Sequence, residues 1–281
     1  GMIIPPSVPM IIYALVSEES VGKLFLGSLI PGVMIGLLML GITLAISYWK
    51  KYPREEVVMT GKEKADRIKQ SILALIMPVF VVGAVVFGIA TATESAGIGV
   101  LYAFIIGAFV IRQLKFKAIP PLMRDSILTS ANVMVIIALS KLYIWILALE
   151  RIPQTVAAIV SGLELPAFVI LLVIDIIILI AGTFVDVSPA ILLLTPVFLP
   201  AANVLGVSRI QFGVILILGL AVGLVTPPVG MCLNVASAIS KLGIGTIFRA
   251  AMPFLIANII TLILITYIPQ LSMWLPAVFF D

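Results

Sequence analysis

Long apolar runs, separated by short charged segments, dominate the sequence. They cover residues 25–49, 71–92, 95–111, 127–149, 166–185, 188–204, 210–240 and 250–268. A run of about 20 apolar residues can cross the ~30 Å hydrocarbon core of a bilayer as a helix. The pattern therefore predicts an all-α polytopic membrane protein.

The run over 210–240 is too long to be a single straight crossing. It holds no formal charge, and as one helix it would span roughly 46 Å. Adjacent prolines remove amide donors and break such a helix, and flanking glycines permit unusual backbone angles. We therefore expect an interruption within the bilayer, at Gly223, Thr226, Pro227, Pro228 and Gly230.

Exposed backbone at membrane depth is tolerated only where it lines a cavity enclosed by protein. Two half-helix ends that face such a cavity can bind ions and anions. The interruption therefore predicts an ion and substrate site. The alternative is a proline kink that only shapes packing.

A second interruption opens the chain, with the sequence Gly1-Met-Ile-Ile-Pro5-Pro6-Ser7. A shift of 222 residues places Pro5 and Pro6 on Pro227 and Pro228, and the same shift places Pro31 on Pro253. Paired interruptions in corresponding halves are the best sequence indication of a transporter's binding site. Pro5, Pro6 and Ser7 are therefore candidate site residues as well.

The offset also predicts the organisation of the chain. Residues 1–59 are interpreted as the end of a first repeat and residues 60–281 as a complete second repeat, with roughly 160 residues expected before Gly1. The second repeat would hold scaffold helices at about 71–149, a hairpin at about 166–204, the broken helix 210–240 and a last helix at 250–268.

Charge placement predicts the topology. Residues 50–69 hold seven basic and four acidic residues, and 112–124 holds four basic residues. Lys and Arg mark cytoplasmic loops, so both segments are expected in the cytoplasm, the first as a solvated loop with a short amphipathic helix. The helices after the two interruptions then run in opposite directions, which is the inverted-repeat pattern of alternating-access transporters.

The composition mainly serves to exclude other classes of protein. Hydrophobic residues make up 62% and charged residues 11% of the chain, against about 45–50% and 25% in soluble proteins. The single cysteine, Cys232, excludes an internal disulfide framework, and the absence of histidine excludes a Ser-His-Asp triad. The net charge of +4 fits cytoplasmic loops, so no nucleic-acid partner is expected.

Candidate ion ligands gather between the apolar arms 166–185 and 188–204. Gly182, Thr183, Asp186 and Ser188 lie at the junction, and Thr195 follows two turns later. An ionisable residue within a membrane is a functional candidate by default, and oxygen ligands suit a hard cation. We expect Na⁺ at Gly182, Asp186 and Thr226. The alternative is that Asp186 only caps the following helix.

Other polar residues leave several interpretations open. Hydropathy alone does not separate two crossings over 166–204 from a re-entrant hairpin. Asp175 could serve as a proton or ion relay, or make a polar contact with a neighbouring helix. Glu94 and Lys141 could pair inside the bundle, or each could reach water.

Assembled in order, these motifs resemble the large membrane subunit of TRAP (tripartite ATP-independent periplasmic) transporters over essentially the whole chain. The matching segments are Gly1-Met-Ile-Ile-Pro-Pro-Ser7, Ala92-Thr-Glu94-Ser-Ala, Asp186 with Leu194-Thr-Pro196, Gly223-Leu-Val-Thr-Pro-Pro-Val-Gly230, and the closing stretch from Pro253 through Pro269 to Pro276. Cys232 departs from the family, which often has Asn there.

The resemblance implies an elevator-type secondary transporter with inverted repeats, a re-entrant hairpin and discontinuous helices. It implies sodium-coupled import of an organic anion, such as a C4-dicarboxylate or sugar acid, across the bacterial inner membrane. A periplasmic substrate-binding protein and a small membrane subunit would be its partners, with Na⁺ as coupling ion and no other cofactor. The rival functions are an ion channel and an intramembrane enzyme that uses Asp175 and Asp186, although no known catalytic motif surrounds these residues.

Overall fold

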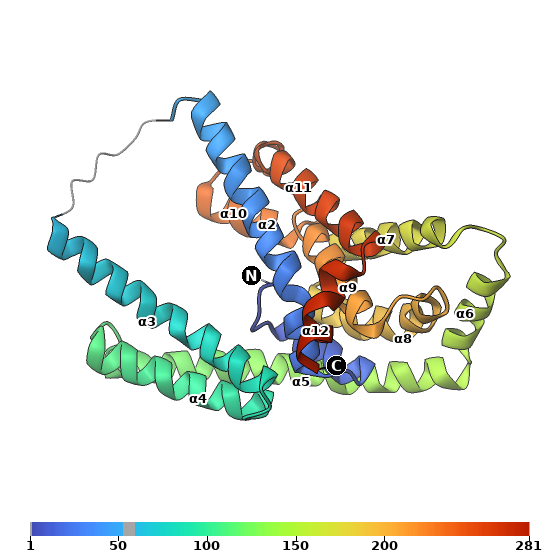
Figure 1. Cartoon of the computed structure of the whole chain (residues 1–281), viewed down its shortest axis with the longest axis horizontal. Helices are drawn as coiled ribbons and strands as arrows, with labels where there is room; N and C mark the ends of the chain where they lie inside the picture. The colour runs from blue at the N-terminus through green and yellow to red at the C-terminus, as the bar shows by residue number, and fades with distance from the viewer. Residues whose placement is uncertain (1, 53–59, 281) are drawn as a thin grey trace. The chain divides into compact units, whose positions relative to one another are not determined.

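The computed structural model describes residues 2–52 and 60–280, and all regular elements in these ranges are helical (Figure 1). Within these described ranges, seven helices are long and apolar enough to cross a membrane, which confirms an all-α polytopic membrane protein. They are α2 (Val21–Trp49), α3 (Gly61–Val86), α4 (Ala92–Ile105) with the π-helical turn Ile106–Val110, α5 (Ile119–Leu149) after the 3₁₀ turn Phe116–Ala118, α7 (Ala167–Phe184), α8 (Val187–Val204) and α11 (Ile244–Tyr267).

Shorter helices complete the described chain. They are α1 (Val8–Ser17), α6 (Ile152–Gly162), α9 (Arg209–Gly223), α10 (Met231–Ser240) and α12 (Gln270–Phe280). The described residues fall into two compact units, one within 1–43 and 133–281 and the other within 44–132. The candidate site residues all lie in the first unit.

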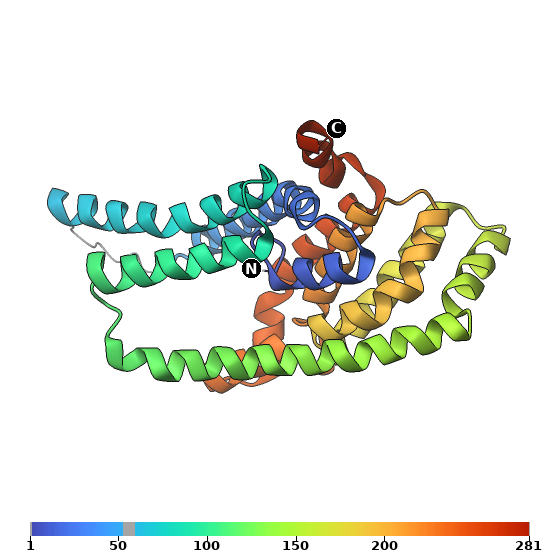
Figure 2. The same ribbon diagram turned by 90° about the horizontal axis from the view of Figure 1, so that it is seen from below.

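In the smaller unit, α3 and α4 pack side by side (Figures 1 and 2). The Tyr102 hydroxyl donates to the carbonyl oxygen of Leu73 at 2.8 Å and links the two helices. Thr91 precedes α4, and its backbone N–H and hydroxyl both donate to the Glu94 carboxylate at 2.8 Å. Glu94 therefore has a local role, because it completes a capping box that satisfies free donors at the start of α4.

The core of the larger unit forms around α9. Its residues from Ile210 to Leu220 are all buried, and α1, α7, α8, α11 and α12 pack against it. A helix that is apolar on every side must be surrounded by other elements. The sequence of α9 therefore requires a central position, and this position fixes where the interruption after Gly223 lies.

Reciprocal hydrogen bonds tie the start of α9 to α1. The Tyr13 hydroxyl donates to the carbonyl oxygen of Arg209 at 2.7 Å. Arg209 Nη1 donates to the carbonyl oxygen of Ser17 at 3.2 Å. Because the Tyr13 side chain is fully buried, its hydroxyl depends on this bond.

Replacing Tyr13 with Phe should therefore lower the free energy of unfolding by about 1 kcal/mol, the usual net contribution of one hydrogen bond. Thermal unfolding of the purified protein measures the change. Tyr48→Phe is the matched control, because Tyr48 is 79% exposed. Equal stability of the two variants would contradict a structural role for the Tyr13 hydroxyl.

The two stretches related by the 222-residue shift share one order of elements. Each begins with a cis Pro–Pro bond, Pro5–Pro6 or Pro227–Pro228. A ten-residue helix follows, α1 or α10, and then a long helix with an internal proline, α2 or α11. After the shift, the helix starts agree within one residue. The division into repeats at residue 59 stays a prediction.

Some segments differ from the sequence-based interpretation. Residues 61–69 are not a separate short helix but the first turns of α3, because Thr60 and Glu63 form a capping box that starts this helix. Hydrogen bonds from the Thr60 backbone and hydroxyl lower the pKa of Glu63. Helices α6 and α12 were not predicted. Positions 53–59 of the predicted cytoplasmic loop lie outside the described residues.

Candidate functional site

The second Pro–Pro segment separates α9 from α10. Helix α9 ends at Gly223 and α10 begins at Met231. Between them, the Thr226 N–H donates to the carbonyl oxygen of Gly223 at 2.9 Å, and the Cys232 N–H reaches back to Leu224 at 3.1 Å. Gly230 has φ of +51°, a left-handed conformation that favours glycine. The chain thus forms a compact loop between two half-helices.

This loop leaves backbone oxygens free. Pro227 and Pro228 carry no N–H, so neither can continue the helical ladder. Among the described residues, no hydrogen bond reaches the carbonyl oxygens of Val225, Thr226 or Pro227. Free carbonyl oxygens within a membrane protein need a polar partner. A bound cation can fill that role.

The end of α7 packs directly on the end of α9. A Cβ atom added at Gly182 would lie 2.8 Å from the carbonyl oxygen of Leu220, and one added at Gly223 would collide with the backbone of Gly182. The Gly230 N–H also points to the carbonyl oxygen of Thr183 at 3.4 Å. This close approach is possible only with glycine at both positions. It places the junction between α7 and α8 next to the loop.

A pocket of about 300 Å³ lies at this contact. Its polar residues are Thr183 and Thr226, and its lining includes Pro227, Pro228 and apolar side chains of α7 and α11. The Thr183 hydroxyl donates to the carbonyl oxygen of Ile180 at 2.7 Å, and the Thr226 hydroxyl donates to that of Val222 at 2.9 Å. Each hydroxyl has thus used its one proton, so its oxygen remains an acceptor.

These oxygens are neutral hard ligands. Hydroxyl and carbonyl oxygens suit Na⁺ better than a soft transition metal. No cluster of three or more His, Cys, Asp or Glu residues that could hold a metal occurs in the described part of the chain. The free carbonyl oxygen of Gly182, to which no described hydrogen bond runs, adds a further oxygen to the same junction.

Three predicted site residues lie elsewhere. Asp186 is exposed at the N-cap of α8, makes no capping hydrogen bond through its side chain, and does not line the pocket. Ser188 is half-buried in the first turn of α8. Thr195 is fully buried, and its hydroxyl has no partner among the described residues. The pocket therefore joins Thr183 and Thr226 without including Asp186.

The first Pro–Pro segment lines a different cavity. Ser7 is buried, and its hydroxyl donates to the carbonyl oxygen of Met2 at 2.5 Å. Residues Met2, Ile3 and Ile4 border a cavity of about 470 Å³ together with Leu224 and Val225. The 222-residue shift places Met2 on Leu224 and Ile3 on Val225. Both interruptions therefore contribute equivalent positions to one cavity.

Sequence reasoning missed Asn258 in this second cavity. Asn258 lies in α11 and lines the cavity together with Cys232, and its side-chain oxygen is buried without a partner among the described residues. An amide inside the apolar run 250–268 was the available signal.

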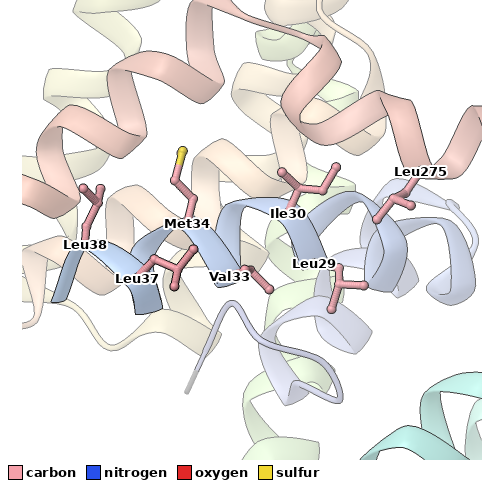
Figure 3. Close-up of a pocket in the computed structure, with 7 residues that line it drawn as sticks. All are labelled: Leu29, Ile30, Val33, Met34, Leu37, Leu38 and Leu275. Carbon is pink, nitrogen blue, oxygen red and sulfur yellow. The ribbon is translucent and has the colours of Figure 1, made fainter. Parts of the chain in front are cut away.

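A further groove of about 580 Å³ along α2 is lined only by apolar side chains (Figure 3). This groove therefore offers no ligand to an ion.

Comparison with known proteins places this chain in a family. Residues 1–271 match the family described as tripartite ATP-independent periplasmic transporter, DctM component. The C4-dicarboxylate TRAP transporter large permease protein DctM of Pseudomonas aeruginosa is 36% identical over 276 residues, which cover 98% of this chain and 64% of that protein.

Two further relatives carry different substrate names. The isethionate TRAP transporter permease protein DctMQ of Oleidesulfovibrio alaskensis is 35% identical, over 98% of this chain and 43% of its own. The sialic acid TRAP transporter large permease protein SiaM of Vibrio cholerae is 32% identical, over 99% of this chain and 65% of its own. The chain thus spans less than two thirds of the length of these relatives.

Proposed function

Because the chain belongs to the DctM component family of the tripartite ATP-independent periplasmic transporters, we propose that it acts in sodium-coupled import of an organic anion across the bacterial inner membrane. The observation that carries the proposal is the junction of Gly182 and Gly223. There Thr226 and Pro227, whose carbonyl oxygens accept no hydrogen bond among the described residues, line one pocket together with Thr183. Na⁺ bound at these oxygens would couple its gradient to transport.

The mechanism that we propose is of the elevator type, in which the ion and substrate site moves across the membrane as one body. The repeated order of Pro–Pro loop, short helix and long helix supports an inverted-repeat architecture. A soluble periplasmic binding protein would deliver the substrate, and a small membrane subunit would brace the large one.

The relatives' names and the lining of the cavities support the proposed substrate class. C4-dicarboxylate, isethionate and sialic acid, named for three relatives, are all organic anions. No basic side chain lines the two site cavities. Backbone N–H groups at half-helix ends, together with bound Na⁺, would therefore neutralise the anion. We expect side chains that line the larger of these cavities, such as Asn258, to contribute to the choice among carboxylates and sulfonates.

Counterflow in proteoliposomes tests the function. The transporter is reconstituted with its partner subunits, loaded with unlabelled substrate and exposed to a trace of labelled substrate. A carrier accumulates label transiently, because exchange through one alternating site couples the two fluxes. A channel gives simple equilibration, and an enzyme gives chemical conversion of the substrate. Either of these two results would overturn the proposal.

Asp186 provides a separate prediction, because it lies beside the junction but outside the pocket. If its carboxylate attracts Na⁺ to the neutral oxygens, Asp186→Asn should raise the sodium concentration needed for half-maximal uptake by several-fold, with little effect on folding. Initial uptake rates over a sodium titration measure the change, and Glu164→Gln is the control. An unchanged sodium response in a well-folded Asp186→Asn protein would leave Asp186 without an ion-binding role.

A further inference from the structure

Asp175 is a buried carboxyl group that the proposed transport site does not use. It lies in the middle of α7 and is only 3% exposed. Its Oδ2 atom lies 2.9 Å from the Thr266 hydroxyl near the end of α11. Its Oδ1 atom is buried and has no hydrogen-bond partner among the described residues. An ionised carboxylate in this position would be very unfavourable.

A residue of a third helix, α9, holds Thr266 in place. Gln211 of α9 donates through Nε2 to the carbonyl oxygens of Ile265 and Thr266, both at 3.1 Å. These carbonyls belong to the last turn of α11, where no intrahelical donor is available. The buried Gln211 side chain therefore fixes the end of α11 against α9 and presents the Thr266 hydroxyl to Asp175.

The Thr266 hydroxyl makes two contacts that together require two protons. The Thr266 oxygen lies 2.9 Å from Asp175 Oδ2 and also 2.9 Å from the carbonyl oxygen of Leu262. A threonine hydroxyl carries one proton, and neither a carbonyl oxygen nor a carboxylate can supply another. An ionised Asp175 therefore leaves one of these two contacts without a hydrogen. A protonated Asp175 donates to Thr266, and Thr266 then donates to Leu262, so both contacts are satisfied.

We propose that Asp175 is a proton-binding site, in which a neutral carboxyl group of α7 donates to Thr266 of α11. The proton keeps the interface between α7 and α11 free of net charge. When the proton leaves, a charged carboxylate remains between apolar helices, and its Oδ1 atom still has no hydrogen-bond partner among the described residues. Deprotonation of Asp175 therefore weakens the contact between α7 and α11.

The helices that pack against α7 offer no charged group that could balance the negative charge of an ionised Asp175. Helix α8 contains no charged residue. In α9 the charged residue is Arg209, which donates to Ser17. In α11 it is Arg249, which precedes Thr266 by about 25 Å of helix. The titratable Tyr267 directs its hydroxyl to the carbonyl oxygen of Phe168 at 2.7 Å.

Infrared difference spectroscopy of the intact purified protein tests the proposal. A neutral carboxyl group in the bilayer region gives the carbonyl stretch of a carboxylic acid, whereas an ionised one gives carboxylate bands. We expect the wild type to show the acid band at neutral pH and Asp175→Asn to lack it. Thr266→Val should keep the band and shift its frequency, because the acceptor of the proton is lost.

Stability against pH provides a second readout. The unfolded chain releases the Asp175 proton above about pH 4, whereas the folded chain retains it. Rising pH should therefore destabilise the wild type relative to Asp175→Asn, whose amide cannot ionise and still donates to Thr266. We expect the Tm of the wild type to fall relative to that of Asp175→Asn as the pH rises above about 4.

Two results would overturn the proposal. One is a pH-independent difference in Tm between wild type and Asp175→Asn. The other is a wild-type acid band that neither Asp175→Asn nor Thr266→Val alters. If Asp175→Asn does not fold, the band shift in Thr266→Val, compared with Thr266→Ser as the control that keeps the hydroxyl, decides the question.

Discussion

Replacing Gly223 with alanine should separate the end of α7 from the end of α9 and abolish uptake. The added Cβ atom would collide with the backbone of Gly182 and lie 2.8 Å from the Thr183 nitrogen. Both contacts are backbone atoms, so no side chain can rotate away. Overpacking of this kind costs about 1–3 kcal/mol or forces the backbone apart. Thermal unfolding and initial uptake rate, measured on the same preparations, report the two effects.

Gly41→Ala is the matched control for this prediction. Gly41 lies in α2, and a Cβ atom added there would meet nothing within 4 Å. Alanine in an open helical position favours the folded state by roughly 0.4–1 kcal/mol. We therefore expect Gly41→Ala to keep both stability and uptake. A Gly223→Ala protein that behaves like Gly41→Ala would contradict the close packing of the junction.

Joint replacement of Pro227 and Pro228 by alanine should produce a stable protein that transports poorly. The two alanines supply two new N–H donors, which allow α9 to continue past Gly223. The carbonyl oxygens that now lack partners would then enter helical hydrogen bonds and leave the candidate ion site. We expect uptake to fall at least about tenfold, which corresponds to roughly 1.4 kcal/mol at the transport barrier.

The competing interpretation is that the Pro–Pro segment only shapes packing. It predicts lower stability, with uptake lost in proportion to the folded fraction. Circular dichroism for helix content, Tm and initial uptake rate separate the two interpretations. Pro253→Ala serves as control, because Pro253 lies inside α11 and not in the loop. Retained uptake in a stable double variant would mean that the loop oxygens do not bind the transported species.

The spanning helices and the position of the interruption could be predicted from the sequence. Apolar runs longer than about 18 residues predict crossings by length alone, and Pro227 with Pro228 excludes a continuous helix. Helices α6 and α12 were missed because each has only 11 residues. Short helices depend on tertiary packing rather than on propensity, and α6 packs on α8.

The residues that line the candidate pocket were harder to predict than the position of the interruption. Gly182 of α7 and Gly223 of α9 lie far apart in the sequence and come into contact only in the folded protein. No local sequence pattern therefore predicts their contact. Asp186 was the favoured ligand because it is charged, yet Thr183 and Thr226 line the pocket and Asp186 does not. The pairing of Asp175 with Thr266 likewise depends on Gln211, which positions the end of α11.

The measurement that tests sodium coupling most directly is substrate uptake by the reconstituted transporter under imposed ion gradients. An inward Na⁺ gradient should drive accumulation of the organic anion above its external concentration, and reversal of that gradient should drive its release. A K⁺ gradient of the same size should do neither, because the proposal assigns the coupling role to Na⁺. Accumulation that is equal under Na⁺ and K⁺ gradients, or that persists without either, would contradict sodium-coupled transport.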